Sequence, residues 1–143
     1  MQANEIENVD LKFLTIDDYD ELKEIMLVSY EGIEDSYWNK NQIATLIEKF
    51  PEGQVVIKVN DELAGCAFSI IVDDDALEDH HTYKEITDDY TFNTHSSDGD
   101  ILYGIDVFVK PEFRGLRLGR RLYEYRKELC EKLNLKSIAF GGR

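Results

Sequence analysis

Glycines and arginines stand close together at positions 114–121, and phosphate binding is the chemistry that this combination favours. Gly115 and Gly119 allow the backbone to turn tightly and to come close to a ligand. A helix that starts here has first N–H groups without backbone partners, at the positive end of the helix dipole. The stretch therefore predicts a phosphate or diphosphate site in a chain whose net charge is -14, and the arginines concerned are Arg114, Arg117, Arg120 and Arg121.

The elements on either side of this stretch are expected to form a strand, a turn and a helix. Ile101–Val109 is rich in β-branched and aromatic residues, as a buried strand is. Pro111 has no N–H and disfavours helical backbone at the residue before it, so the strand is expected to end there. From Leu118 to Asn134, apolar residues recur at helical spacing. A plain strand-to-helix connection with a solvated basic face remains the alternative interpretation, because short glycine motifs also match by chance.

Residues 109–122 resemble the acyl-CoA signature of the GNAT superfamily of N-acetyltransferases, which runs roughly V-x-P-x-[YF]-[RQ]-G-x-G-x-[GA]-x-x-L. One residue departs from the pattern, because Arg117 stands where the family usually has glycine, and this affects how a diphosphate would be bound. The order of the expected elements is also similar to the GNAT order over almost the whole chain. The matching positions are Val109, Pro111, Phe113, Arg114, Gly115, Gly119 and Leu122.

The resemblance implies how acetyl-CoA, the cosubstrate of the family, would be held. Its diphosphate would lie on the turn amides of residues 114–120, and its pantetheine arm would follow the edge of the signature strand. The acyl carbonyl would meet a backbone N–H near Phe108 or Val109, which stabilises developing negative charge. No metal is expected. The cofactor-binding residues implied in this way are Val107, Phe108, Val109, Arg114, Gly115, Leu116, Arg117, Leu118, Gly119 and Arg120.

The resemblance also implies a catalytic base. The reaction would be direct attack of an amine on the thioester, and an alkyl amine with a pKa near ~10.4 must first lose a proton. GNAT enzymes often place a carboxylate on the signature strand for this task, and Asp106 is the acid at about that place. The alternative is that Asp106 is a strand-end acid held by backbone groups or by a neighbouring arginine.

The rest of the chain is expected to build an α/β (α+β) fold, a GNAT-like mixed central sheet flanked by three main helices. The sheet would be mostly antiparallel, with a parallel pair at the signature strand, because a strand–helix–strand crossover makes its two strands parallel. Asp17 or Asp18 is expected to cap a first helix that runs to about Tyr30. The other expected elements are strands at Val9–Ile16, Gln54–Val59, Leu63–Val72 and Lys136–Phe140, and helices at Asn39–Phe50 and Leu118–Asn134.

A chain of 143 residues is expected to form one domain, and residues 1–143 resemble a GNAT domain that is partial or cut from a longer chain. GNAT domains usually continue with another helix and two more strands, and the tyrosine that usually serves as general acid lies on that helix. It is therefore not assigned here. An exposed sheet edge at this point favours pairing with a second copy or with a following catalytic domain.

The amino-acid composition indicates which kinds of partner and which cell compartment to expect. The net charge of -14 argues against nucleic acid and favours cationic substrates such as amines. No apolar run reaches the ~20 residues needed to span a bilayer, and the first residues lack a secretion signal, so a cytoplasmic protein without a membrane partner is expected. Cys66 and Cys130 are far apart and are interpreted as reduced core thiols.

Residues 73–100 are acidic, irregular and contain all three histidines, His80, His81 and His95. Long loops are often lids or binding loops, so this segment is interpreted as a cover over the amine site, with a solvated insertion as the alternative. A metal site is disfavoured, because the spacing fits no recognised zinc or calcium pattern. The aromatic residues of the connection Tyr30–Trp38 are expected to pack rather than to border the substrate pocket.

Two functions follow, from different classes. The first is an N-acetyltransferase that moves an acetyl group from acetyl-CoA to a primary amine of a small molecule or a peptide. The second is a non-catalytic acyl-CoA-binding regulatory module of a larger multidomain enzyme. A structural partner domain with a decayed site is a third hypothesis. The sequence carries no readable code for the acceptor.

Overall fold

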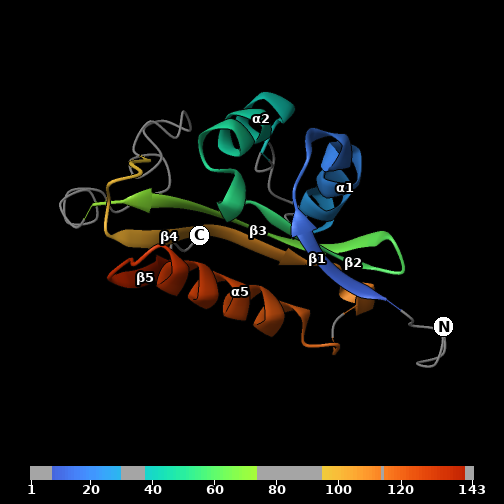
Figure 1. The fold of residues 1–143 in the computed structure, drawn as a ribbon. Coiled ribbons are helices and arrows are strands. Elements are labelled where there is room, and N and C mark those ends of the chain that lie inside the picture. The colour runs from blue at the N-terminus through green and yellow to red at the C-terminus, as the bar shows by residue number, and fades with distance from the viewer. Residues whose placement is uncertain (1–7, 30–37, 74–94, 114, 141–143) are drawn as a thin grey trace.

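The computed structural model describes residues 8–29, 38–73, 95–113 and 115–140, which form a five-stranded sheet with helices on both faces (Figure 1). The strands lie in the sheet in the order β1-β2-β3-β4-β5. The pairs β1–β2, β2–β3 and β3–β4 are antiparallel, and β5 is parallel to β4. This confirms the mixed sheet expected from the sequence. The strands are β1 (Val9–Phe13), β2 (Val55–Val59), β3 (Glu62–Val72), β4 (Ile101–Val109) and β5 (Ser137–Phe140).

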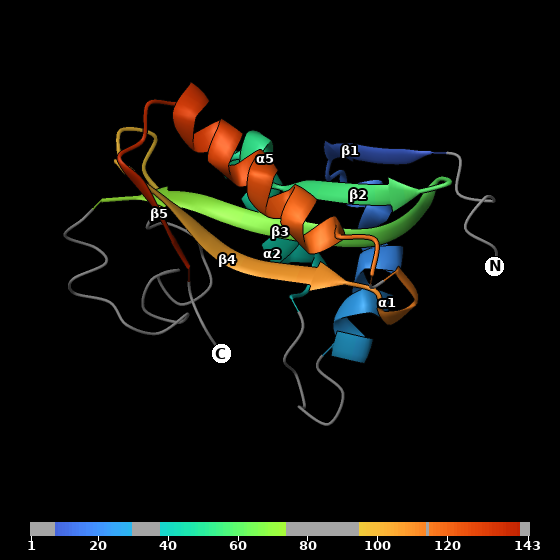
Figure 2. The ribbon, with the colours of Figure 1, turned by 90° about the horizontal axis from the view of Figure 1, so that it is seen from below.

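Three α-helices cover the two faces of the sheet. Helices α1 (Tyr19–Ser29) and α2 (Lys40–Lys49) lie on one face, and α5 (Leu118–Lys132) crosses the other (Figures 1 and 2). Short 3-10 turns precede α1, follow α2 and follow β4, at Ile16–Asp18, Pro51–Gly53 and Pro111–Phe113. The helices and the crossover are those that the apolar periodicity predicts.

The first strand is shorter than expected, because the chain turns at Thr15 to start the helical segment. Thr15 and Asp18 form a capping box, in which the Thr15 N–H donates to Asp18 Oδ2 at 3.1 Å. The residue at the cap position is therefore Thr15, a correction to the expectation of Asp17 or Asp18. Asp18 also pairs with Lys58 at 3.0 Å. Burial raises the pKa of Asp18, but the hydrogen bonds from Thr15 and Lys58 outweigh burial and leave that pKa lowered.

Local sequence signals also explain α2 and the β2–β3 hairpin. Asn39 and Gln42 form a second capping box at the start of α2, where Gln42 N–H donates to Asn39 Oδ1 at 2.8 Å. Asn60 and Asp61 have φ angles of 51° and 68°, the left-handed pair that a tight hairpin turn requires. Gly65, in β3, faces the backbone of β4: a Cβ there would lie 2.7 Å from the Phe108 carbonyl oxygen.

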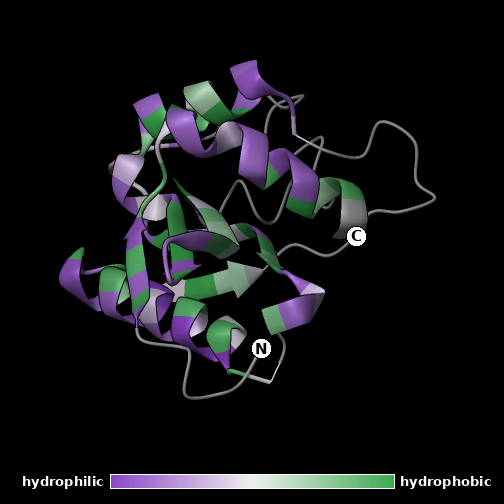
Figure 3. Ribbon diagram, turned by 90° about the vertical axis from the view of Figure 1, so that its right-hand side faces the viewer, coloured by the Kyte–Doolittle hydropathy of each residue, from purple (hydrophilic) through white to green (hydrophobic). Residues whose placement is uncertain are grey.

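The apolar core has two layers, one on each side of the sheet. The larger lies under α1 and α2, and the other lies under α5. Hydrophilic and hydrophobic residues alternate along the helices (Figure 3), as expected for amphipathic helices. Cys66 and Cys130 are buried and free, and burial raises the pKa of both thiols. Among the residues that the structure describes, no helix combines the length and apolar character needed to cross a bilayer.

Candidate functional site

Strand β4 carries a bulge near its centre. Phe68 pairs with Asp106, but the next residue of β3, Ser69, pairs with Gly104. Ile105 is thus an extra residue in β4 without a counterpart in β3. The register of the strand therefore changes directly before Asp106.

The bulge reverses which face of the sheet the β4 side chains occupy. Tyr103 and Ile105 belong to the core under α1 and α2, so odd-numbered residues face that side before the bulge. After the bulge the even-numbered Phe108 lies in the same core, and Asp106 bonds there to Trp38. Without the extra residue, Asp106 would face α5 instead. The bulge thus turns the candidate base toward α1 and α2.

Beyond the bulge, β4 has an open edge on the side away from β3. In the described part of the chain, β5 pairs with Ile101–Gly104 along its whole length, and it ends at Phe140. Val107 lies in the open part and is 42% exposed. Residues 105–109 therefore present backbone groups that no described strand covers on this side.

The pairing with β3 decides which amides point to that open edge. Lys110 N–H donates to the Ala64 carbonyl at 2.8 Å, which identifies the adjacent Gly65–Val109 pair as not hydrogen-bonded. Hydrogen-bonded and non-hydrogen-bonded pairs alternate along an antiparallel ladder. The N–H groups of Val109 and Val107 therefore point away from β3 and toward the open edge.

The same alternation places the Phe108 N–H against β3, opposite Cys66. In such a hydrogen-bonded pair the Phe108 N–H is directed at the Cys66 carbonyl oxygen, so it is not available at the open edge. Of the strand residues expected to hold acyl-CoA, Val107 and Val109 offer amides at the edge, whereas Phe108 contributes its ring to the core.

The turn after β4 bends through left-handed backbone. Gly115 has a φ of 93°, and Arg117 has a φ of 59° and a ψ of 32°. Glycine adopts this region without cost, whereas other residues are strained there. This explains why the signature that the stretch resembles has glycine at the position of Arg117. Arg114 lies outside the described residues.

The start of α5 exposes unpaired backbone donors. The first hydrogen bond within the helix joins Arg121 N–H to the Arg117 carbonyl at 3.2 Å. The N–H groups of Leu118, Gly119 and Arg120 come before this bond and therefore have no acceptor within the helix. The Arg117 side chain does not cap α5, and the first turn of α5 contains no acidic residue. A Cβ built on Gly119 meets no atom within 4 Å. Packing therefore does not require glycine here, and the space is open to a ligand.

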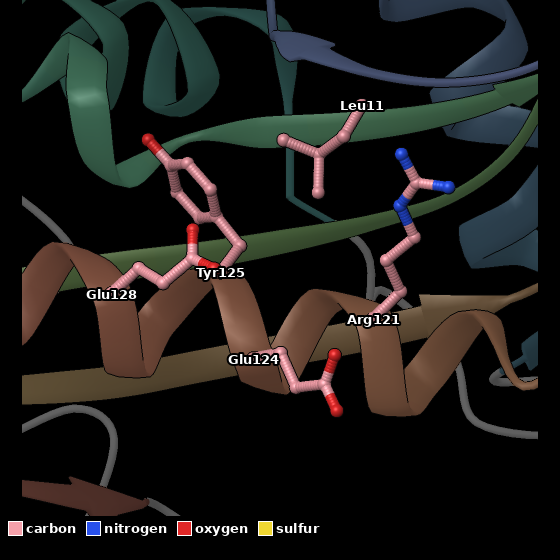
Figure 4. Close-up of a pocket in the computed structure, with 5 residues that line it drawn as sticks. All are labelled: Leu11, Arg121, Glu124, Tyr125 and Glu128. Carbon is pink, nitrogen blue, oxygen red and sulfur yellow. The ribbon is translucent and has the colours of Figure 1, made fainter.

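The arginines of the turn divide into two groups. Arg117 and Arg120 are exposed at the corner, and Arg120 pairs with Glu124 at 3.2 Å. Arg121 instead extends from α5 toward Leu11 of β1 (Figure 4). It lines a surface pocket of about 310 Å³ on that side, together with Leu11, Glu124, Tyr125 and Glu128. Of the described arginines, Arg117 and Arg120 thus remain for a diphosphate at the corner.

Asp106 is half-buried and held by residues from both faces of the sheet. Its Oδ2 accepts the indole N–H of Trp38 at 3.0 Å, and its carbonyl accepts from Arg126 Nη2 at 2.8 Å. Trp38 is buried, as the packing interpretation expected, and its carbonyl accepts the Tyr19 hydroxyl of α1 at 2.8 Å. Trp38 also places an N–H on the candidate base, a contact that the sequence did not suggest.

Arg126 is a residue of this region that sequence reasoning missed. It lies in α5 and is 2% exposed. Its Nη2 donates to the Phe68 carbonyl at 2.6 Å as well as to Asp106, and its Nε donates to Ser69 Oγ at 3.0 Å. The available signal was its position, four residues after Leu122 and three before Leu129 on the buried face of the helix.

His95 lies at the other end of the sheet and takes no part in this corner. Its Nδ1 accepts the Ile71 N–H at 3.0 Å, and its ring stacks on Phe50 with centroids 5.0 Å apart. Burial, with a smaller contribution from Lys49, lowers its pKa. It lines a cavity of about 460 Å³ with Glu52, Asp98 and Asp100 among others.

The cover that the sequence predicts at residues 73–100 falls mostly outside the described residues. Positions 74–94, which include His80 and His81, lie outside the described residues. Within the described ranges, no three His, Cys, Asp or Glu side chains are grouped so that they could hold a metal ion.

Comparisons with known proteins find one family model and several relatives that match this chain. The sequence model described as "Acetyltransferase (GNAT) family" matches residues 19–141. The chain is 39% identical over 126 residues to "Probable hydrolase YhcX" of Bacillus subtilis (strain 168), which covers 88% of this chain and 24% of that protein. It is 31% identical over 106 residues to "Uncharacterized N-acetyltransferase YkwB" of the same organism, covering 74% of this chain and 47% of that protein. The chain thus spans about a quarter of the length of the first relative and about half of the second.

Solved structures show the same fold. The loading GNATL domain of CurA from Lyngbya majuscula superimposes with a TM-score of 0.69 at 25% identity, covering 87% of this chain and 59% of that one. A GNAT-like decarboxylase, GphF, in complex with isobutyryl-CoA gives a TM-score of 0.66 at 16% identity, covering 81% of this chain and 56% of that one.

Proposed function

The chain belongs to the acetyltransferase (GNAT) family, and on that premise we propose that it transfers an acetyl group from acetyl-CoA to a primary amine. The acceptor is a small molecule or a peptide. The observation that carries the proposal is one continuous path, in which the open edge of β4 leads through left-handed backbone to the uncapped start of α5. Acyl transfer from CoA needs both ends of this path, one for the thioester and one for the diphosphate.

The diphosphate of acetyl-CoA would bind at the start of α5. The N–H groups of Leu118, Gly119 and Arg120 are directed along the helix axis, at the positive end of the dipole. The open space beside Gly119 admits a phosphate close to the backbone. Arg117 and Arg120 are exposed nearby and add charge, and Gly115 and Leu116 belong to the described part of the same turn.

The pantetheine arm would pair with the open edge of β4, and the acyl oxygen would accept from an amide there. The pairing register favours the N–H of Val107 or Val109, because both point away from β3. A fixed N–H donor at this place stabilises negative charge that develops on the acyl oxygen during attack. Phe108 would contribute through its buried ring, which fixes the strand on the core.

Asp106 would take the proton of the attacking amine, directly or through a water molecule. It stands next to Val107, so the base and the amide for the acyl oxygen are neighbours in the chain. The bulge turns its side chain toward α1 and α2, the face opposite α5. The Trp38 indole N–H stabilises the ionised carboxylate, which is the form that accepts a proton.

A second function is supported by the coverage of the relatives. The chain matches 24% of a protein named "Probable hydrolase YhcX" and a loading domain of CurA. A non-catalytic module that binds acyl-CoA and regulates a larger enzyme would show the same match. Its partner would be an associated catalytic domain or a second copy of the chain.

Two measurements, made one after the other, test these two functions. Calorimetric titration with acetyl-CoA comes first, and absence of binding would remove both functions. Release of the CoA thiol in the presence of a panel of primary amines comes second. The transferase predicts amine-dependent release, whereas binding without release for every amine would favour the regulatory module.

A further inference from the structure

Three hydrogen bonds from Arg126 converge on the bulge of β4. The guanidinium group donates to the carbonyls of Phe68 and Asp106, which pair across β3 and β4 directly beside the extra residue. It also donates to the hydroxyl of Ser69, on the other side of the register change. One side chain of α5 thus contacts both strands at the point where their register changes.

Packing alone does not account for an arginine at this position. A buried guanidinium group is costly unless hydrogen bonds replace its water, and Arg126 is 2% exposed. Its neighbours on the same face of α5, Leu122 and Leu129, are apolar. A planar group with several donors is suited to bridge carbonyls of two strands where ordinary ladder pairing is interrupted.

The bulge controls both groups that the proposed reaction needs. Shifting the strand by one residue would turn the Asp106 side chain toward α5. The same shift would also reverse which N–H groups of β4 point toward β3 and which point away from it. The Val107 N–H would then point toward β3 and no longer face the open edge. The candidate base and the candidate acyl-oxygen donor therefore depend on one local register.

We infer that Arg126 is a positioning residue, which holds the β4 bulge and thereby orients Asp106 and the Val107 amide for acyl transfer. The inference rests on the proposed function for its catalytic consequence, but the register itself is observable without turnover. Arg126 does not touch the diphosphate corner in this scheme. Its loss should therefore lower kcat much more than it changes the affinity for acetyl-CoA.

The test compares Arg126→Met with Arg126→Lys and with Leu129→Ala, a control that alters the same buried face of α5 one turn further on. Nuclear Overhauser contacts report the register, because Ala67 and Val107 form a non-hydrogen-bonded pair with adjacent Hα atoms. We expect Arg126→Met to lose this contact and Leu129→Ala to keep it. We also expect kcat to fall by about 100-fold in Arg126→Met, with acetyl-CoA affinity changed by less than about threefold.

The outcomes separate this inference from the proposed function. If Arg126→Met retains the Ala67–Val107 contact at full intensity, Arg126 does not hold the register and the inference is overturned. If the wild-type protein acetylates no amine, the transferase proposal fails while the same contact still decides the role of Arg126. Should Arg126→Met not fold, Arg126→Lys takes its place, because it keeps the charge but offers fewer simultaneous bonds. A partial loss of the contact in Arg126→Lys supports the inference, and full retention contradicts it.

Discussion

Two hydrogen bonds, one to its backbone and one to its side chain, hold Asp106 in the candidate site. Its backbone is fixed from the α5 face by Arg126, and its carboxylate is fixed from the opposite face by Trp38. Such fixed groups cost little reorganisation when a reaction begins. The left-handed Arg117 and the open space at Gly119 are the other residue-level features on which the account depends.

Asp106→Asn tests the base directly. The amide keeps the size of the carboxylate and an oxygen for the Trp38 N–H, but it does not accept a proton from an amine. We expect kcat to fall by about 100-fold or more and the acidic limb of the pH–rate profile to disappear. Calorimetry should show acetyl-CoA affinity within about twofold of wild type, since the diphosphate corner is unchanged. Asp10→Asn, at an exposed acid of β1, is the control, and an unaltered rate in Asp106→Asn would remove this residue from the mechanism.

Arg117→Gly tests two properties of Arg117, the effect of its strained backbone on stability and the effect of its charge on acetyl-CoA affinity. Relief of the left-handed strain is partly offset by the greater freedom of glycine in the unfolded chain, so we expect a gain in unfolding free energy of up to about 1 kcal/mol. Affinity for acetyl-CoA should fall several-fold at low salt if the guanidinium group contacts the diphosphate. Arg117→Lys keeps both the strain and a charge and is the matched control. A glycine variant that is less stable than Arg117→Lys would contradict the strain argument.

At the scale of the element, the two ends of the sheet have different roles. The end formed by β4 and the start of α5 carries the open edge and the unpaired helix amides. At the other end, His95 bonds to Ile71 of β3, stacks on Phe50 after α2 and lines the cavity of about 460 Å³. The first end supplies the backbone donors of the proposed acyl-CoA site, whereas the contacts of His95 at the second end stabilise the sheet.

His95→Gln should reduce the pH dependence of stability. Burial and Lys49 lower the pKa of folded His95, so the unfolded chain binds a proton at higher pH than the folded one. Stability from this group is therefore complete above the ordinary pKa of about 6.5 and is lost as the pH falls toward the folded value. Glutamine also accepts the Ile71 N–H but does not titrate.

The measurement for His95 is the unfolding free energy in urea at about pH 7.5 and about pH 5.5, on either side of the ordinary histidine pKa. We expect wild type to lose more stability between these pH values than His95→Gln. Glu52 and Lys49 face the histidine in both proteins, so the difference between the two proteins isolates the imidazole. Equal losses would show that His95 does not contribute.

At the scale of the whole molecule, the sequence predicted the layers and the element order well, because apolar periodicity and caps are local signals. The end of β1 was misplaced, since the Thr15 capping box competes with the strand pattern. The bulge could not be predicted, because Ile101–Ile105 is buried throughout and gives no alternation from which a reversal could be detected. Arg126 was missed for a related reason, since its role depends on the carbonyls of Phe68 and Asp106 that meet beside that bulge.

The net charge of -14 also acts on the whole molecule. A negative field attracts cationic acceptors from a distance and is screened by salt over about 10 Å at 0.1 M. We expect kcat/KM for a diamine to fall as salt rises from about 0.05 to about 0.5 M. The monoacetylated form of the same diamine, with one charge fewer, should be affected less. Equal salt dependence for the two amines would show that the field does not guide the acceptor.

The central claim is that acetyl-CoA lies against the backbone at the start of α5, and Gly119→Leu tests it most directly. The space beside Gly119 is empty, and leucine favours helix by about 0.8 kcal/mol over glycine, so stability should not fall. Glu131→Leu, at an exposed position near the other end of the same helix, is the control. In calorimetric titration with acetyl-CoA, we expect Gly119→Leu to lose at least about tenfold in affinity, whereas Glu131→Leu should bind as wild type does. Unchanged affinity in a folded Gly119→Leu protein would contradict the claim.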